Sequence, residues 1–87
     1  MLATVQIMPD MTEVCLENTG SDSLREVQVA CGGRSLGIIS RLVPGEKKVL
    51  ALAGRQEKLL VSALDSADRR IAGSIQYIPS ESWDRSA

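Results

Sequence analysis

The chain contains no histidine and no phenylalanine, and its only aromatic residues are Tyr77 and Trp83. Without histidine it cannot build a Ser-His-Asp catalytic set, and its two cysteines cannot complete the four ligands of a usual zinc site. Two aromatic residues also leave few surfaces on which sugars or single-stranded nucleic acids could stack. The sequence therefore predicts a protein that is not an enzyme, with no catalytic residues, no metal site and no cofactor.

Long apolar runs and clusters of like charge are also missing. Ten basic and eleven acidic side chains give a net charge of −1 and are scattered along the chain, which predicts no nucleic-acid partner. No run approaches the roughly 18 apolar residues that span a bilayer, so we expect no membrane insertion by this segment. Residues 1–6 lack the features of a secretory signal. If the parent protein is exported, we expect these 87 residues to be a piece of it.

What the chain does contain is a series of short runs of Val, Ile and Leu separated by turn residues. This pattern is typical of an antiparallel all-β domain, and 87 residues suffice for one domain. We predict a seven-stranded β-sandwich over residues 1–79 and a polar tail or linker over residues 80–87. An amphipathic helix over residues 57–70 is the main local alternative. The predicted strands cover residues 2–8, 12–18, 25–31, 36–42, 48–53, 57–64 and 69–78.

Alternation within the strands assigns the two cysteines to different faces. Val14 and Leu16 share one face of their strand, so Cys15 is expected to point away from the core. Cys31 shares the inward face with Val27. Side chains that point in opposite directions cannot be bridged without moving the backbone, so we predict two free thiols.

Glycine, proline and short polar residues mark the turns. Pro44-Gly45 is typical of a type II turn, with proline at the first central position and glycine at the second. Residues 18–23 form the strongest loop signal, because Asn and Gly accept positive φ and the Asp and Ser side chains bond local backbone groups. Residues 32–34 predict another turn, and residues 65–68 predict a hairpin loop.

These turns, taken with the valine alternation between them, resemble a known pattern. It consists of Asn18-Thr19-Gly20-Ser21, the strand 24–29, Leu36-Gly37, and Leu42-Val43-Pro44-Gly45-Glu46. The chain resembles the bacterial and archaeal immunoglobulin-like domains related to the CARDB and DUF11 groups, over residues 14–77. The resemblance implies a seven-stranded immunoglobulin-like sandwich that occurs as one unit among several in cell-surface or exported proteins. It implies no particular ligand, because such turn motifs record backbone requirements rather than chemistry.

Two sets of polar residues suggest alternatives to a purely structural role, one catalytic and one calcium-binding. Cys31 and Arg34 flank a glycine turn, where the arginine could lower the thiol pKa, and Asp65 is the remaining residue on which an enzyme could draw. A packed cysteine at a strand end is favoured instead. Asp65 and Asp68 could ligate calcium through a loop, but a solvated hairpin is the favoured reading.

The residues that remain point to contacts with other proteins. Leu60 and Leu64 lie on the second face of an apolar strand, and Trp83 is either an anchor in a groove or part of a disordered tail. These three residues are the predicted interface. We expect a non-enzymatic spacer or protein-binding module of a larger surface or exported protein, with other domains or copies of itself as partners. The alternative is a self-assembling structural subunit of a filament, surface layer or capsid decoration.

Overall fold

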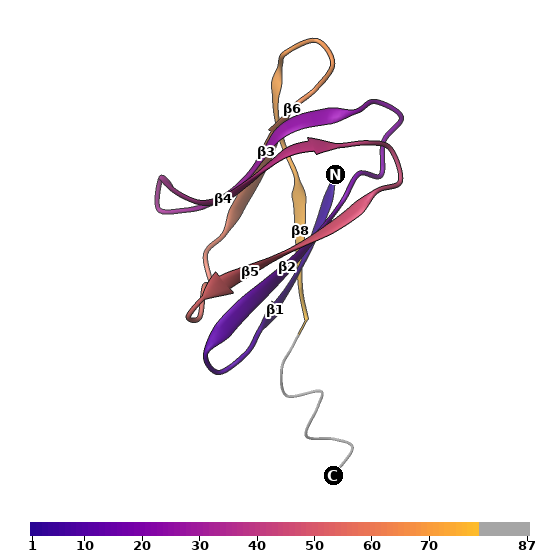
Figure 1. The fold of residues 1–87 in the computed structure, drawn as a ribbon. Coiled ribbons are helices and arrows are strands. Elements are labelled where there is room, and N and C mark those ends of the chain that lie inside the picture. Colours follow the sequence, from indigo (N-terminus) through magenta and orange to yellow (C-terminus); the bar gives the residue numbers. More distant parts are fainter. Residues whose placement is uncertain (79–87) are drawn as a thin grey trace.

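The chain forms two four-stranded sheets packed face to face (Figure 1). The computed structural model describes residues 1–78, and all regular structure in that range is β-strand. One sheet, here the β1 sheet, has the order β5-β2-β1-β8, and the other, the β3 sheet, has the order β4-β3-β6-β7. The strands are β1 (Leu2–Ile7), β2 (Met11–Glu17), β3 (Leu24–Cys31), β4 (Arg34–Leu42), β5 (Lys47–Ala53), β6 (Leu60–Leu64), β7 (Arg70–Ala72) and β8 (Ser74–Ile78).

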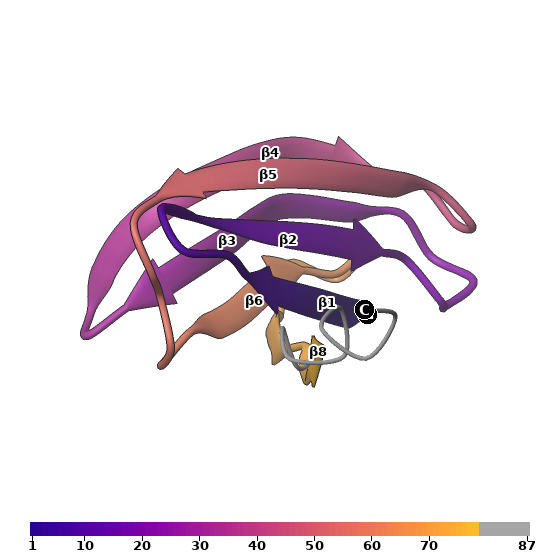
Figure 2. The ribbon, with the colours of Figure 1, turned by 90° about the horizontal axis from the view of Figure 1, so that it is seen from below.

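Figure 2 shows the strands of the β1 sheet in the order β5, β2, β1 and β8. The core between the two sheets is built from aliphatic side chains, as the lack of aromatics requires. Leu16 and Leu42 are the largest of the fully buried side chains. The other buried apolar residues are Ala3, Val5, Val14, Leu24, Val27, Val29, Ile39, Leu52, Leu59, Val61 and Ala63. The prediction of an all-β, two-layer fold is therefore confirmed.

The predicted faces of β2 and β3 agree with the structure. Val14 and Leu16 are buried, whereas Cys15 between them is half-buried on the outer face of the β1 sheet. Val27 is buried, and Cys31 packs against the core from the β3 sheet. The two cysteines are free and belong to different sheets.

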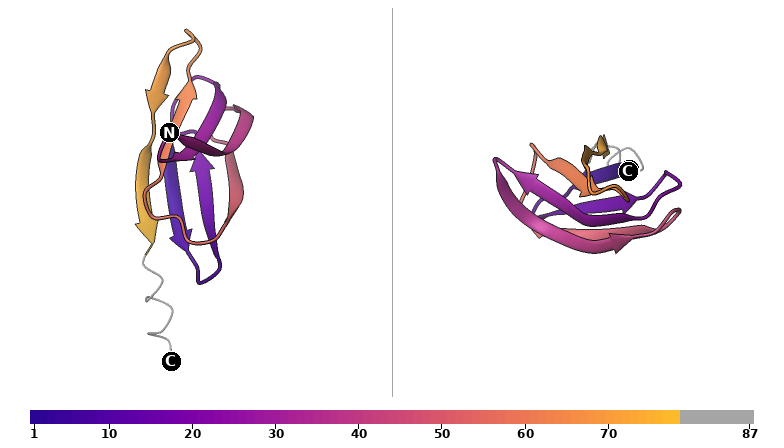
Figure 3. Two further views of the ribbon diagram at one scale, coloured as in Figure 1. Left: turned by 90° about the vertical axis from the view of Figure 1, so that its left-hand side faces the viewer. Right: turned by 90° about the horizontal axis from the view of Figure 1, so that it is seen from above.

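The structure has eight strands where the sequence predicts seven, because the segment 69–78 divides at Gly73. Before Gly73, β7 pairs with β6; after it, β8 pairs with β1 in the opposite sheet. Figure 3 shows the two strands following each other along one side of the molecule. The Gly73 N–H donates to the Val61 carbonyl at 2.8 Å, and the Ser74 N–H donates to the Met1 carbonyl at 3.0 Å. A β-carbon at Gly73 would lie 2.9 Å from Cε of Met1 and 3.3 Å from Cγ1 of Val61, so a glycine fits this crossing.

The prediction of an antiparallel fold is wrong for one pair of strands, because β8 runs parallel to β1. Leu2 lies opposite Ser74, and Gln6 lies opposite Ile78. The other strand pairs are antiparallel. This parallel pairing follows from the change of sheet. β7 and β8 run in the same direction, but β7 lies beside β6, which runs the opposite way, and β8 lies beside β1, which runs the same way.

The segment 57–64 forms a shorter strand than predicted, and the helical alternative over 57–70 is wrong. Only Leu60–Leu64 pairs with β3, while residues 57–59 belong to the connection from β5. Alternation within the strand is as predicted, because Leu59, Val61 and Ala63 are buried. On the second face, residues 1–78 leave Leu60 69% exposed, whereas Ser62 and Leu64 are half-buried.

The predicted turns adopt the required backbone conformations. Gly45 has a φ of 80°, and the Glu46 N–H donates to the Val43 carbonyl at 3.0 Å, as a type II turn requires. Gly32 and Gly33 both have positive φ, which is the requirement of a two-residue hairpin between β3 and β4.

Candidate functional site

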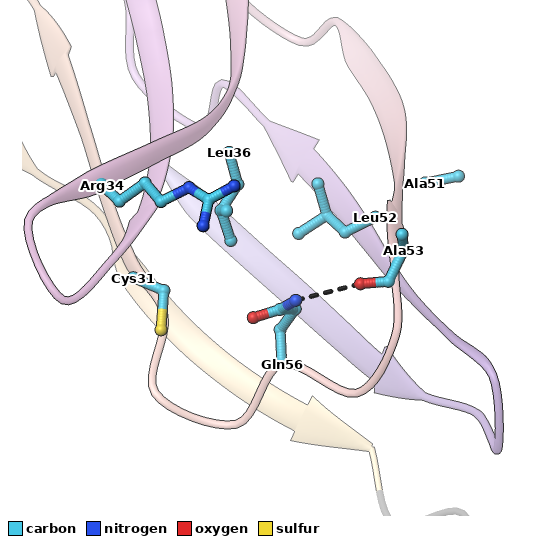
Figure 4. A pocket seen from close by; sticks show the side chains of 7 residues that line it. All are labelled: Cys31, Arg34, Leu36, Ala51, Leu52, Ala53 and Gln56. Carbon is cyan, nitrogen blue, oxygen red and sulfur yellow. Dashed lines mark hydrogen bonds between the residues drawn. The ribbon is translucent and has the colours of Figure 1, made fainter.

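A hollow of about 360 Å³ lies where β3 and β5 end and β4 begins (Figure 4). Its chemistry-bearing side chains are the thiol of Cys31, the guanidinium of Arg34 and the amide of Gln56. The wall is aliphatic, with Leu36, Ala51, Leu52 and Ala53. The hairpin places Cys31 directly opposite Arg34 in register, so two of the residues considered for catalysis do meet here.

The third residue of that hypothesis, Asp65, lies at the opposite end of the β3 sheet. It borders a second hollow of about 220 Å³ with Met1, Asn18 and Leu24. Cys31 and Arg34 are therefore not joined by Asp65. Among residues 1–78, no group of three or more Cys, Asp or Glu side chains is arranged to hold a metal ion.

The loop after β5, which carries Gln56 into the first hollow, is held by the buried hydroxyl of Thr12. Thr12 Oγ1 donates to the Gly54 carbonyl at 2.9 Å and accepts the Gln56 N–H at 2.8 Å. The Gln56 side chain in turn donates to the Ala53 carbonyl at 3.0 Å. Tyr77 holds the other end of this connection, since its hydroxyl donates to the Glu57 carbonyl at 2.9 Å. These polar groups hold the loop between β5 and β6.

We expect Thr12→Val to lower the free energy of unfolding by about 2 kcal/mol. Valine fills the same space but leaves the Gly54 carbonyl and the Gln56 N–H without their partner in a part-buried position. Urea unfolding followed by circular dichroism measures the change. Thr12→Ser keeps the hydroxyl and should recover most of the loss; equal losses for both variants would contradict the role given to these hydrogen bonds.

At the opposite end of β2, Asn18 connects three separate segments. Its Nδ2 donates to the carbonyls of Asp22 and Leu42, at 2.7 and 2.9 Å, and its Oδ1 accepts the Gly20 N–H at 3.0 Å. Its own carbonyl accepts the Gly45 N–H at 2.8 Å. Asn18 is 2% exposed, so these bonds are largely removed from water. The loop signal at 18–23 thus contains a buried structural residue, which sequence reasoning did not identify.

The Asp65 carboxylate closes the hairpin between β6 and β7. Oδ1 accepts the N–H groups of Ala67 and Arg69, both at 2.9 Å, and Oδ2 accepts Arg69 Nε at 3.2 Å. Asp68, with a φ of 61°, forms an ion pair with Arg25. The Asp65 carboxylate thus has its partners within the hairpin, and the Asp68 carboxylate has its partner on β3.

These bonds lower the pKa of Asp65 below its usual value of 3.8, chiefly through the Arg69 N–H and also through the Ala67 N–H and the Arg69 charge. A lowered pKa in the folded state stabilises the fold above the unfolded-state pKa, and this contribution is lost as the pH falls through the folded-state value. We therefore expect NMR titration of the Asp65 carboxyl carbon to give a pKa below 3.8. Asp65→Asn should remove this part of the acid sensitivity. An ordinary pKa for Asp65 would contradict the assignment.

The structure places the predicted interface residues apart. Leu60 and Leu64 share the outer face of the β3 sheet but lie at opposite ends of β6. Leu60 is 69% exposed, whereas Leu64 is half-buried and lies opposite Arg25 on β3 and Arg70 on β7. Trp83 lies outside the described residues.

Two further aliphatic side chains that are more than half exposed were not identified from the sequence. Ile38, 60% exposed, lies on the outer face of the β3 sheet beside Gln28, and Val49, 57% exposed, lies on the outer face of the β1 sheet beside Cys15. In β5 both faces carry aliphatic residues, so the sequence could not show which side was buried. Both sheets therefore present apolar groups to solvent.

Comparisons with known proteins do not add a function to this geometry. No protein-family model, curated protein or solved structure matches the chain. Within residues 1–78, no helix is long and apolar enough to cross a membrane.

Proposed function

We propose that this chain is an immunoglobulin-like module that acts as a non-enzymatic spacer or protein-binding unit of a larger surface or exported protein. The strand order supports the fold part of the proposal. Counting β7 and β8 as one strand bent at Gly73 gives seven strands. The first, second and fifth then share one sheet, and the third, the sixth and the first part of the seventh (β7) share the other, which supports an immunoglobulin-like arrangement. The second part of the seventh strand (β8) joins the first sheet beside β1. The fourth strand pairs with the third, which is the arrangement of domains that carry an additional strand on that sheet.

The observation that carries the spacer proposal is the direction of β1 and β8. Because the two strands are parallel and adjacent, the chain enters the β1 sheet at Leu2 and leaves it at Ile78, at the other end (Figure 1). Four residues of register separate Ser74, which lies beside Leu2, from Ile78, or about 13 Å of extended chain. Domains joined through such ends follow one another in a line rather than side by side.

The roles of the buried and turn-forming polar groups also support a structural module. Thr12, Asn18, Asp65 and Tyr77 each hold a connection between strands through hydrogen bonds to backbone groups. These polar side chains therefore stabilise the connections between strands. The outer faces and edges of the sheets remain as the surfaces for contacts with other proteins.

Small-angle X-ray scattering of two copies of the chain joined in tandem tests the spacer proposal. We expect a rod whose maximum dimension is close to twice that of one copy, because the chain enters and leaves at opposite ends. The single chain measured under the same conditions is the control. A compact particle, with the two copies side by side, would contradict the proposal.

Thiol labelling at neutral pH distinguishes a structural role for Cys31 from a role as a catalytic nucleophile in the first hollow. We expect Cys31 to react no faster than cysteine in an unfolded peptide, because it is half-buried and packs against the core. Cys31→Ser leaves Cys15 as the internal reference for labelling. Labelling of Cys31 much faster than the peptide would indicate an activated thiol and would count against a purely structural role.

The second candidate function is a self-assembling structural subunit. The exposed aliphatic residues on both outer faces favour it, since Ile38, Val49 and Leu60 are each more than half exposed. Light scattering over a range of concentrations separates the two candidates, because an isolated spacer stays monomeric whereas a subunit associates.

A further inference from the structure

The outer edge of β5 presents a regular row of backbone hydrogen-bonding groups. The Asn18 N–H donates to the Glu46 carbonyl, and the Gly54 N–H donates to the Asp10 carbonyl, both at 3.1 Å. These bonds lie just beyond the two ends of the β2–β5 pair, so the even-numbered residues of β5 direct their backbone groups toward β2. Antiparallel pairs alternate, so the odd-numbered residues direct theirs away from β2. These residues are Lys47, Val49, Ala51 and Ala53.

Within residues 1–78, three of these four residues have a backbone donor and acceptor that no other group bonds. The Ala53 carbonyl is occupied by the Gln56 side chain at 3.0 Å, which leaves Lys47, Val49 and Ala51. The strand contains no proline, and its pairing with β2 shows no register shift. Lysines, which protect edge strands against pairing, occur only at its first two positions.

The other sheet edges are less suited to pairing. β4 has a register shift where it pairs with Val29 and Ala30, and its Arg41 carbonyl accepts Lys48 Nζ at 3.2 Å. β7 and β8 contain three and five residues and form the side where the chain changes sheets. Among the strands that the structure describes, β5 therefore has the longest regular edge with available backbone groups.

We propose that β5 pairs antiparallel with β5 of a second copy of this chain, with Val49 opposite Val49 on the two-fold axis. In this register Lys47 of each copy lies opposite Ala51 of the other, so the bonds use the three residues whose backbone groups are available. If the two-fold axis passed through Ala51 instead, Val49 of each copy would lie opposite Ala53 of the other, whose carbonyl is already bonded to the Gln56 side chain. The two β1 sheets then form one continuous sheet, and the contact is the same from both sides.

Charge complementarity supports this register. Ala51 lies opposite Glu13 on β2 of its own copy, and Lys47 lies opposite Glu17 on β2 of its own copy. In the paired sheet Lys47 of the other copy therefore lies between its own Glu17 and, across the small alanine side chain, Glu13. The two strands that carry this lysine and this glutamate are about 10 Å apart. The lysine stem can lie over the alanine methyl group and bring its ammonium toward the carboxylate. The antiparallel arrangement also keeps Lys47 of one copy away from Lys47 of the other.

Sedimentation velocity over a range of concentrations tests the proposal, which rests on the second candidate function. We expect a monomer–dimer equilibrium with a Kd on the order of 100 µM for the full chain, as for a small contact. Val49→Lys places two like charges on the axis and should weaken association by about tenfold or more. Leu60→Lys adds the same charge at a position of the other sheet that is also more than half exposed, and it should leave the Kd unchanged. Circular dichroism verifies that both variants fold.

A charge exchange tests the register independently. Lys47→Glu alone should weaken association, and adding Glu13→Lys should restore it, because the two charges then attract again with reversed signs. A wild-type chain that stays monomeric at about 1 mM overturns the proposal, but leaves the spacer function intact. Association that Leu60→Lys weakens and Val49→Lys does not overturns the β5 contact, while self-assembly through another surface stands.

Discussion

Replacing Asn18 by alanine is expected to lower the free energy of unfolding by about 3 kcal/mol, a large share of the stability of a domain this small. The substitution leaves the Leu42 carbonyl without its donor in a buried position and removes the acceptor of the Gly20 N–H. The loop 18–23 also loses the bond from Nδ2 to the Asp22 carbonyl, whereas the bond from the Gly45 N–H to the main-chain carbonyl of residue 18 is kept. Urea unfolding followed by circular dichroism measures the loss.

Two variants show whether hydrogen bonding at Asn18 is responsible. Asn18→Asp keeps the shape and the acceptor but directs an oxygen at two carbonyls, so it should be at least as destabilising as alanine. Thr19→Ala alters the exposed neighbour and should change the stability by less than about 0.5 kcal/mol. If Asn18→Asp is as stable as the wild type, the hydrogen-bond account of this residue is wrong.

Leu16→Ala is expected to cost about 3 kcal/mol, because it removes one of the two largest fully buried side chains. The core contains no aromatic residue that could shift to fill the space, and the small aliphatic neighbours are held on two sheets. Thermal or urea unfolding measures the loss.

The next residue along the strand provides the matched control. Glu17 lies on the outer face of the β1 sheet opposite Leu2 and Lys47, so Glu17→Ala should change the stability by less than about 0.5 kcal/mol. Similar losses for Leu16→Ala and Glu17→Ala would show that the faces of β2 are assigned incorrectly.

Much of the fold could be predicted from the sequence, because alternation and turn chemistry act over a few residues. The faces of β2 and the positive φ of Gly45 are examples. The division at Gly73 could not be predicted in this way. It depends on the approach of Met1 and Val61, residues distant in sequence, which set where β7 leaves β6 and β8 joins β1. The parallel pairing of β8 is a consequence of that division.

The candidate sites were less predictable than the fold. The two-residue turn brings Cys31 opposite Arg34, as expected from a glycine hairpin, but the position of Asp65 at the other end of the sheet depends on the strand order. The exposure of Val49 had no sequence signal, because its strand is aliphatic on both faces. The role of Asn18 also depends on β4, 24 residues away at Leu42.

The spacer proposal depends most directly on the parallel β1–β8 pair, and NMR spectroscopy can observe that pair in solution. Cross-strand nuclear Overhauser effects should connect Leu2 with Ser74, Thr4 with Gln76 and Gln6 with Ile78, in one increasing order. The same spectra should show a slowly exchanging amide at Gly73, bonded to the Val61 carbonyl. Contacts in the reverse order, or none between these segments, would contradict a chain that enters and leaves the β1 sheet at opposite ends.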